Sequence, residues 1–153
     1  MLSRRLGPLG AGLLATGCLW VNWGAGLICD PRYGTVRGAA ALTAIPGTTI
    51  ATWGWAWIVT GVLAAGGAFL PNRVTWIGLV PGTVMPCTWT LAYVVARLLD
   101  EFPQGFASGL TWLVSPVLLG LLAAVTRRWQ EERQHRRRLQ REVDELLAVE
   151  GGG

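Results

Sequence analysis

Residues 38–72 read GAAALTAIPGTTIATWGWAWIVTGVLAAGGAFLPN and contain no charged side chain. A helix rises about 1.5 Å per residue and about 20 residues cross the hydrocarbon of a bilayer, so this run is longer than one straight span. Pro46 lacks an amide hydrogen and disfavours helical geometry at Ile45, which makes it the expected divider. We therefore expect an interfacial or re-entrant segment over 38–45 and a membrane-spanning helix over 47–70.

The composition of the whole chain also favours a membrane protein. Of its 153 residues, 52% are hydrophobic and only 14% are charged, whereas about 25% charged residues are usual in soluble proteins. All of the basic residues are Arg, which is typical of a GC-rich genome. The net charge of +4 does not indicate nucleic-acid binding, because many of the arginines lie beside acidic residues near the C-terminus.

Three further apolar runs have the length expected of a membrane span, and they cover residues 9–29, 74–97 and 105–126. With the run described above, they predict an all-α, polytopic membrane protein whose four transmembrane helices lie within residues 1–126. Pro81 and Pro86 lie inside the third run and predict a kinked or broken helix there.

The three cysteines do not suggest a disulfide framework, because their number is odd and their spacing is irregular. Cys18 and Cys87 lie inside apolar runs, and we expect the thiols to be buried and inert. The segment from Leu14 to Cys18 also resembles a bacterial lipoprotein cleavage site. The apolar run continues past Cys18, however, which favours a first transmembrane helix.

Arginine in the flanks of the spans predicts the orientation, because loops on the cytoplasmic side carry more Lys and Arg. With four spans, one side of the membrane receives the N-terminal head, the turn between the second and third spans and the start of the tail. This side holds Arg4, Arg5, Arg73, Arg127 and Arg128. We therefore expect a multi-pass protein of the bacterial inner (cytoplasmic) membrane with both termini in the cytoplasm.

Residues 127–153 predict a charged cytoplasmic helical tail, since they are rich in helix formers up to the final glycines. Trp129 and Leu139 belong to a heptad-like seam that Glu132 and Arg136 interrupt, so a short coiled coil is an alternative to a solvated, salt-bridged helix. Basic residues of the tail are expected to contact anionic lipid, at about 1 kcal/mol each, or a cytoplasmic partner. These residues are Arg127, Arg128, Arg136, Arg137 and Arg138.

Two further sets of residues are expected to matter for packing and for position in the membrane. Small residues four positions apart let helices approach closely, and these are Gly61, Ala65, Gly105 and Gly109. Close packing within one bundle and self-assembly into a homo-oligomer both explain them. Tryptophans near the ends of spans are typical of interfacial anchors, and these are Trp53, Trp57, Trp76 and Trp129.

The sequence contains no recognisable set of catalytic or metal-ligating residues. The single histidine, His135, lies among arginines and is interpreted as a solvated residue of the tail. No phosphate loop, metal-ligand spacing or nucleophile motif is found, so we expect neither enzymatic activity nor a cofactor. The spans also lack ionisable residues in their interiors, which disfavours an ion-coupled transporter.

Short apolar motifs occur at Tyr33, at 42–46 (LTAIP), at Trp53-Gly54, at 61–64 (GVLA) and around Trp89. Through these motifs, residues 33–129 resemble the small four-span membrane proteins that phages of actinobacteria encode, often beside their lysis genes, and that are sometimes called holins. The resemblance implies a protein that self-associates in the inner membrane and opens lesions for an endolysin. The alternatives are a structural or accessory membrane subunit whose tail binds a cytoplasmic partner, and a small channel or carrier.

The native cysteines allow the predicted orientation to be tested. Cys29 lies against Asp30 at the expected outer end of the first span, whereas Cys18 and Cys87 lie within spans. An impermeant thiol reagent added to intact cells should therefore label Cys29 alone, as read by mass spectrometry. Labelling of a cysteine engineered into the tail under the same conditions would contradict a cytoplasmic location of both termini.

Overall fold

The computed structural model contains helices and no strand over the residues that it describes, which are 7–30, 42, 44–71 and 74–150, with side chains described up to residue 142. Its helices are α1 (Pro8–Cys29), α3 (Ile50–Gly67), α4 (Trp76–Leu98) and α5 (Gly105–Glu150). All four are long and apolar enough to cross a membrane, which confirms that part of the prediction. Their length and composition suggest a multi-pass membrane protein.

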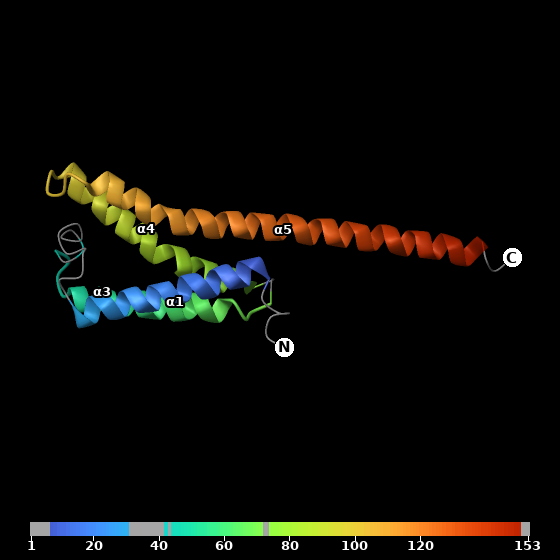
Figure 1. Cartoon of the computed structure of the whole chain (residues 1–153), viewed down its shortest axis with the longest axis horizontal. Helices are drawn as coiled ribbons and strands as arrows, with labels where there is room; N and C mark the ends of the chain where they lie inside the picture. The colour runs from blue at the N-terminus through green and yellow to red at the C-terminus, as the bar shows by residue number, and fades with distance from the viewer. Residues whose placement is uncertain (1–6, 31–41, 43, 72–73, 151–153) are drawn as a thin grey trace.

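Successive helices run in opposite directions and form two pairs (Figure 1). The most extensive contacts join α1 to α3 and α4 to α5, and the contact between α3 and α4 holds the two pairs together. The contact between α1 and α5 is much smaller. Because the helices alternate in direction, the start of α1 lies at the same end of the bundle as the middle of α5.

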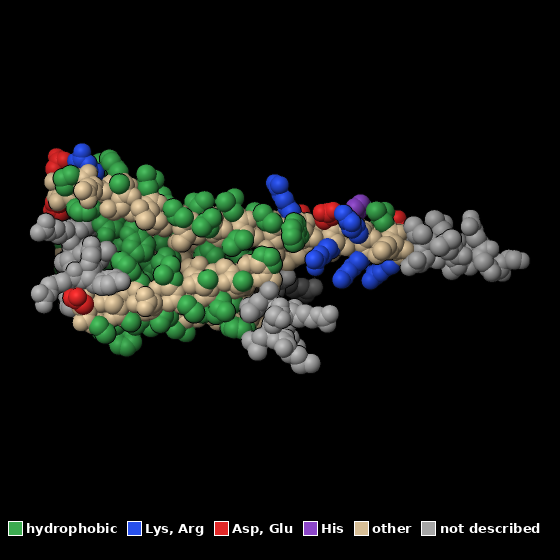
Figure 2. Space-filling view, in the orientation of Figure 1, with side chains coloured by type: hydrophobic (Ala, Val, Ile, Leu, Met, Phe, Trp, Pro, Cys, Tyr) green, Lys and Arg blue, Asp and Glu red, His purple; other side chains and the backbone are tan. Residues whose placement is uncertain are grey.

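The helix α5 continues beyond the ends of the other three helices (Figure 1). Hydrophobic side chains cover the bundle, whereas blue and red side chains gather on the extension of α5 (Figure 2). The predicted fourth span and the start of the predicted tail are therefore one continuous helix. Pro116 lies inside this helix and does not interrupt it.

The helix α3 begins later than predicted, at Ile50, because its N-terminus is capped by threonine. The amide of Thr52 donates to Thr49 Oγ1 at 3.2 Å, and the amide of Thr49 donates to Thr52 Oγ1 at 3.3 Å. This reciprocal arrangement is a capping box and defines the first turn. Gly47 precedes it with a φ of +81°, which a helix cannot contain. Most of the predicted 38–45 segment lies outside the described residues.

The prolines of α4 do not break it, so of the kinked or broken helix predicted there the broken alternative is wrong. Pro86 has no amide hydrogen, so it leaves the carbonyl of Gly82, four residues earlier, without its helical donor. The indole Nε1 of Trp20 in α1 donates to this Gly82 oxygen at 3.0 Å. The helix continues through Pro81 and Pro86, and at Pro86 a neighbouring helix supplies the missing donor, as an apolar surrounding favours.

The helices α1 and α3 approach each other at glycines that recur at a spacing of seven residues, from 17 to 24 and from 54 to 61. Gly17 lies against Gly61 and Ala65, and Gly24 lies against Gly54. A Cβ atom at Gly61 would lie 2.7 Å from the carbonyl oxygen of Gly17, which leaves no room for a side chain. The two backbones are therefore in direct contact, and this close approach is what requires glycine.

The second pair of helices closes through a short turn at the end of α4. Asp100 adopts a left-handed conformation with a φ of 57°, and the amide of Glu101 donates to the carbonyl of Ala96 at 2.9 Å. Arg97 forms an ion pair with Asp100 at 2.6 Å. This turn ends α4 and reverses the chain, so that α5 packs back along α4.

Glycine substitutions at two sites of α3 test the α1–α3 contact. We expect Gly61→Leu to destabilise the protein by about 1–3 kcal/mol or more, because the contact has no space for a side chain. Gly66→Leu is the matched control, since a Cβ there would meet nothing within 4 Å and leucine favours the helix. The measurement is the unfolding midpoint of the purified protein in detergent. Equal destabilisation by the two variants would contradict the described contact.

Candidate functional site

The centre of the bundle is a cluster to which each helix contributes at least one tryptophan, and its central members are Trp20, Trp57, Trp89 and Trp112. The ring centroid of Trp57 lies 4.7 Å from that of Trp20, 5.3 Å from that of Trp112 and 5.4 Å from that of Trp89. Aromatic pairs at such distances contribute about 0.5–1.5 kcal/mol beyond the burial of their surface. The cluster therefore holds all four helices together through Trp57.

This arrangement corrects the prediction that Trp57 anchors the protein at the membrane interface. Trp57 has no exposed surface, so it packs inside the bundle and cannot serve as an anchor. Trp53 also packs against the core, and its Nε1 donates to the carbonyl of Leu42 at 3.3 Å. The outward-facing member of the group is Trp55, whose side chain is 60% exposed.

Trp76 and Trp129, the other two predicted anchors, lie on the surface at the opposite end of the bundle. They are 63% and 57% exposed. Trp129 lines one cavity and Trp76 lines a second, and Thr75 and Gln130 line both of them. Indole rings exposed at the end of a span are typical of the membrane–water interface. An anchoring role for these two residues therefore stays a prediction.

Gly105 and Gly109 of the predicted packing set lie where α5 meets α4. A Cβ at Gly105 would collide with the carbonyl oxygen of Tyr93 and with Arg97 Cβ, and one at Gly109 would lie 3.4 Å from the carbonyl oxygen of Thr90. Thr90 Oγ1 lies 3.1 Å from the carbonyl oxygen of Gly109 and donates across the contact. The predicted pair in α3 lies at the α1–α3 contact described above. Both pairs thus serve packing within a single chain.

The smaller contact between α1 and α5 leaves an open cavity of about 540 Å³, which we call the hydroxyl groove. Its apolar wall comes from residues of α1, α4 and α5, and α5 adds three hydroxyl groups, those of Ser108, Thr111 and Ser115. Thr111 Oγ1 donates to the carbonyl of Ala107 at 3.0 Å. Ser115 Oγ is buried without a hydrogen-bond partner among the described residues. The hydroxyl face of α5 is therefore turned toward α1.

The remaining surface of α5 is strongly apolar and little buried. Only 11% of its apolar 18-residue segment is buried inside the bundle, compared with 39% of the corresponding segment of α4. Large side chains are exposed along it, at Phe106, Leu110, Val117 and Leu121. In a membrane, this surface contacts lipid or another protein, which makes α5 the helix best placed for contacts outside the chain.

The prediction of buried thiols is wrong. Cys18, Cys29 and Cys87 are all free and exposed. The first two lie on α1 and the third on α4, in each case on the part of the helix surface that does not pack on a neighbour. An apolar neighbourhood in the sequence was a poor guide here, since residues that face lipid are as apolar as residues that face the core.

The described part of the α5 extension is helical and its charged side chains are exposed. Glu132 and Arg136 form an ion pair at 2.7 Å, and Arg127 pairs with Glu131 at 3.0 Å. These pairs are exposed and contribute little to stability. The other predicted contact residues, Arg128, Arg137 and Arg138, are exposed as well. The heptad-like seam continues into side chains outside the described residues.

Among the described residues, no group of three or more His, Cys, Asp or Glu side chains could hold a metal ion. Comparisons of the chain with protein-family models, curated protein sequences and solved structures found no match. A function for this chain therefore has to be argued from its packing and its surfaces.

The core position of several residues was not predicted from the sequence. They are Trp20, Gly54, Trp89 and Trp112. The glycines of the α1–α3 contact had a recognisable signal, because the same spacing of seven residues occurs in the first and the second apolar run and is typical of one contact face on each helix. The tryptophans had none, since a tryptophan within a span suits the core and the interface equally well.

A double-mutant cycle tests the hydrogen bond from Trp20 to α4. We expect Trp20→Phe to cost about 1–3 kcal/mol of unfolding free energy, because the Gly82 carbonyl loses the indole donor that replaces the amide missing at Pro86. In a Pro86→Ala background the helix regains an amide for this carbonyl, so Trp20→Phe should cost less. Trp55→Phe, at an exposed site, is the control. The same cost for Trp20→Phe in both backgrounds would show that the indole N–H does not compensate for Pro86.

Proposed function

We propose that the protein is a holin-type membrane protein, which self-associates in the bacterial inner membrane and permeabilises it for lysis. The observation that carries the proposal is the unequal burial of the four helices. The α1–α3 pair is tightly packed through glycine, and the buried share of the apolar segment is 28% in α1 and in α3, 39% in α4 and only 11% in α5. A helix exposed to this extent offers a large surface to further copies of the chain.

The two faces of α5 suggest how association would open the membrane. Its apolar face suits lipid or a neighbouring helix, and the face with Ser108, Thr111 and Ser115 lies along the hydroxyl groove. Hydroxyl groups bond to their own helix or to water at little cost. In an assembly of many copies, separation of α5 from α1 would turn this face toward a water-filled lesion. The small α1–α5 contact supports this, because it is the weakest of the seams that join neighbouring helices around the bundle.

In this proposal, the extension of α5 lies in the cytoplasm together with the N-terminus. The support comes from the arrangement of the helices, since the start of α1 and the middle of α5 line one cavity, and from the arginines on that side. The resemblance to the four-span phage proteins points to the same function.

One observation favours a second candidate function, that of an accessory membrane subunit. The described charged side chains of the α5 extension are exposed. A free helical surface of this kind suits a cytoplasmic partner. This alternative needs no loss of membrane integrity, and the following experiment therefore separates it from the holin proposal.

Induced expression in bacteria that also contain a cytoplasmic endolysin tests the proposal. We expect an abrupt loss of membrane potential followed by lysis, because a membrane lesion dissipates the potential and releases the endolysin. The measurements are a potential-sensitive dye, culture turbidity and the amount of protein in the membrane fraction. Continued growth with an intact potential, at high levels of inserted protein, would remove the holin proposal and leave the accessory subunit.

Two glycine variants separate self-association from folding in the same assay. A Cβ at Gly120 in α5 or at Gly66 in α3 would meet nothing within 4 Å, so leucine at either position leaves the fold of the single chain intact. We expect Gly120→Leu to delay lysis, because it holds neighbouring copies away from α5, and Gly66→Leu to act like the wild type. Gly61→Leu, Gly105→Leu and Gly109→Leu should also delay lysis, since they disturb the bundle itself. Unchanged lysis timing in Gly120→Leu would argue against association through this face.

A further inference from the structure

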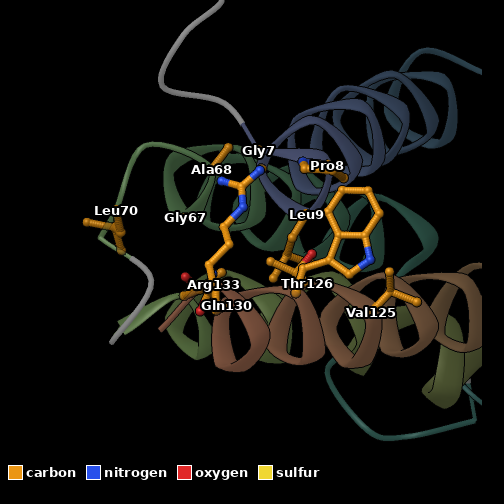
Figure 3. Close-up of a pocket in the computed structure, with 13 residues that line it drawn as sticks. Gly7, Pro8, Leu9, Gly67, Ala68, Leu70, Val125, Thr126, Gln130 and Arg133 are labelled. Carbon is orange, nitrogen blue, oxygen red and sulfur yellow. The ribbon is translucent and has the colours of Figure 1, made fainter. Parts of the chain in front are cut away.

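A second cavity, of about 390 Å³, lies at the other end of the bundle from the hydroxyl groove. Its wall is formed by the start of α1, the end of α3, Thr75 just before α4 and the turns of α5 from Val125 to Arg133 (Figure 3). This is the end from which the charged extension of α5 leaves the bundle (Figures 1 and 2). If the four helices span a membrane, the cavity lies at the level of the lipid headgroups.

The cavity is open because small residues form its floor. Gly10 and Ala68 line it, and they continue the seven-residue spacing of the α1–α3 contact to the point where α3 ends. At its rim, a Cβ on Gly7 would meet nothing within 4 Å. The helices α1 and α3, which are in contact along their glycines, thus border an open space where α1 begins and α3 ends, and no side chain of the described residues fills it.

The lining of the cavity is apolar on one side and cationic on the other. Its apolar wall includes Leu9, Ala68, Leu70, Val125 and Trp129. The side chain of Arg133 rises from α5 with its guanidinium toward the start of α1 near Gly7, and Gln130 lies beside it (Figure 3). Among the described residues that line the cavity, none is Asp or Glu.

Arg133 differs from Arg127 and Arg136 because its guanidinium is not paired with a described carboxylate, and it differs from Arg128 because it lines this cavity. Arg127 and Arg136 each form an ion pair with a glutamate on α5. Arg133 has no ion pair among the residues whose side chains are described, and it faces a cavity. Its guanidinium is thus a positive group beside an apolar wall, an arrangement complementary to a ligand with an anionic head and an apolar chain.

We propose that this cavity binds one anionic phospholipid, with the phosphate on the Arg133 guanidinium and the glycerol end of an acyl chain against the apolar wall. A guanidinium can donate two parallel hydrogen bonds to a phosphate. The first turn of α1 adds the amides of Leu9 and Gly10, which lack acceptors within the helix. The exposed ring of Trp129 suits the same depth. The inference requires insertion in a membrane but not the holin activity.

The test uses the purified full-length protein in detergent and native mass spectrometry of bound lipid. We expect the wild type to retain one phosphatidylglycerol per chain, with at least a tenfold preference over phosphatidylcholine of the same acyl composition. Arg133→Gln should reduce this retention by about tenfold, because the charged donor is lost. Arg128→Gln removes the same charge from a different face of α5 and should bind like the wild type.

A second variant and a second ligand make the outcome decisive. Gly7→Leu keeps every charge but narrows the open rim, and it should also lower the retention of phosphatidylglycerol. Inorganic phosphate, tested as a competitor, should not displace the lipid at equal concentration, since it lacks the apolar chain. Equal losses in the two arginine variants, wild-type binding in Gly7→Leu, equal retention of the two lipids, or displacement by inorganic phosphate would each overturn the proposed lipid site.

Discussion

Direct contact between the backbones of α1 and α3 determines how closely the rest of the bundle can pack. In a bilayer, lipid is as apolar as leucine, so helices gain little by leaving it for each other. Their association depends on dispersion and on hydrogen bonds, both of which require short distances. The glycine pairs 17–61 and 24–54 provide those distances. The same register brings Trp20 within 4.7 Å of Trp57, which starts the aromatic cluster.

Large and small residues lie in different parts of the interior. Glycines occupy the places where backbones touch, and tryptophans fill the wider space among all four helices. Some polar atoms of this interior are satisfied from within, as an apolar solvent favours, whereas Nε1 of Trp57 and of Trp89 is buried without a hydrogen-bond partner among the described residues. The indole Nε1 of Trp20 donates to the Gly82 carbonyl that Pro86 leaves without a helical donor. The hydroxyl of Thr60 donates to carbonyls of its own helix. Packing and hydrogen bonding thus depend on the same close register of α1, α3 and α4.

The helix α5 differs from the other helices because its contact with α1 is small and because it borders a different cavity toward each end of the bundle. Near its start it borders the hydroxyl groove, and near the charged extension it borders the cavity that contains Arg133. A displacement of α5 relative to α1 would change both cavities at once, since α1 lines both of them. In the two proposals, lipid binding at one end of α5 and separation of α5 from α1 at the other end therefore involve the same helix.

The sequence by itself determined the number, the length and the approximate limits of the four apolar helices. These properties are local: a span requires only enough consecutive apolar residues, and the helix predicted from residue 9 begins at Pro8. The capping threonines that delay α3 to Ile50 are local as well, and they were recognisable in principle.

Only the tertiary structure decided which side of each helix became the core. Trp57 suits an interface or an interior, and the choice depends on three tryptophans from other helices. Cys18 and Cys87 lie in apolar runs and yet are exposed, because lipid and protein select for the same apolar side chains. For the same reason the continuity of α4 could not be read from its prolines, since the donor that compensates for Pro86 lies sixty-two positions from its acceptor, on Trp20. In an apolar solvent, polarity no longer separates inside from outside, and only the contacts between helices do.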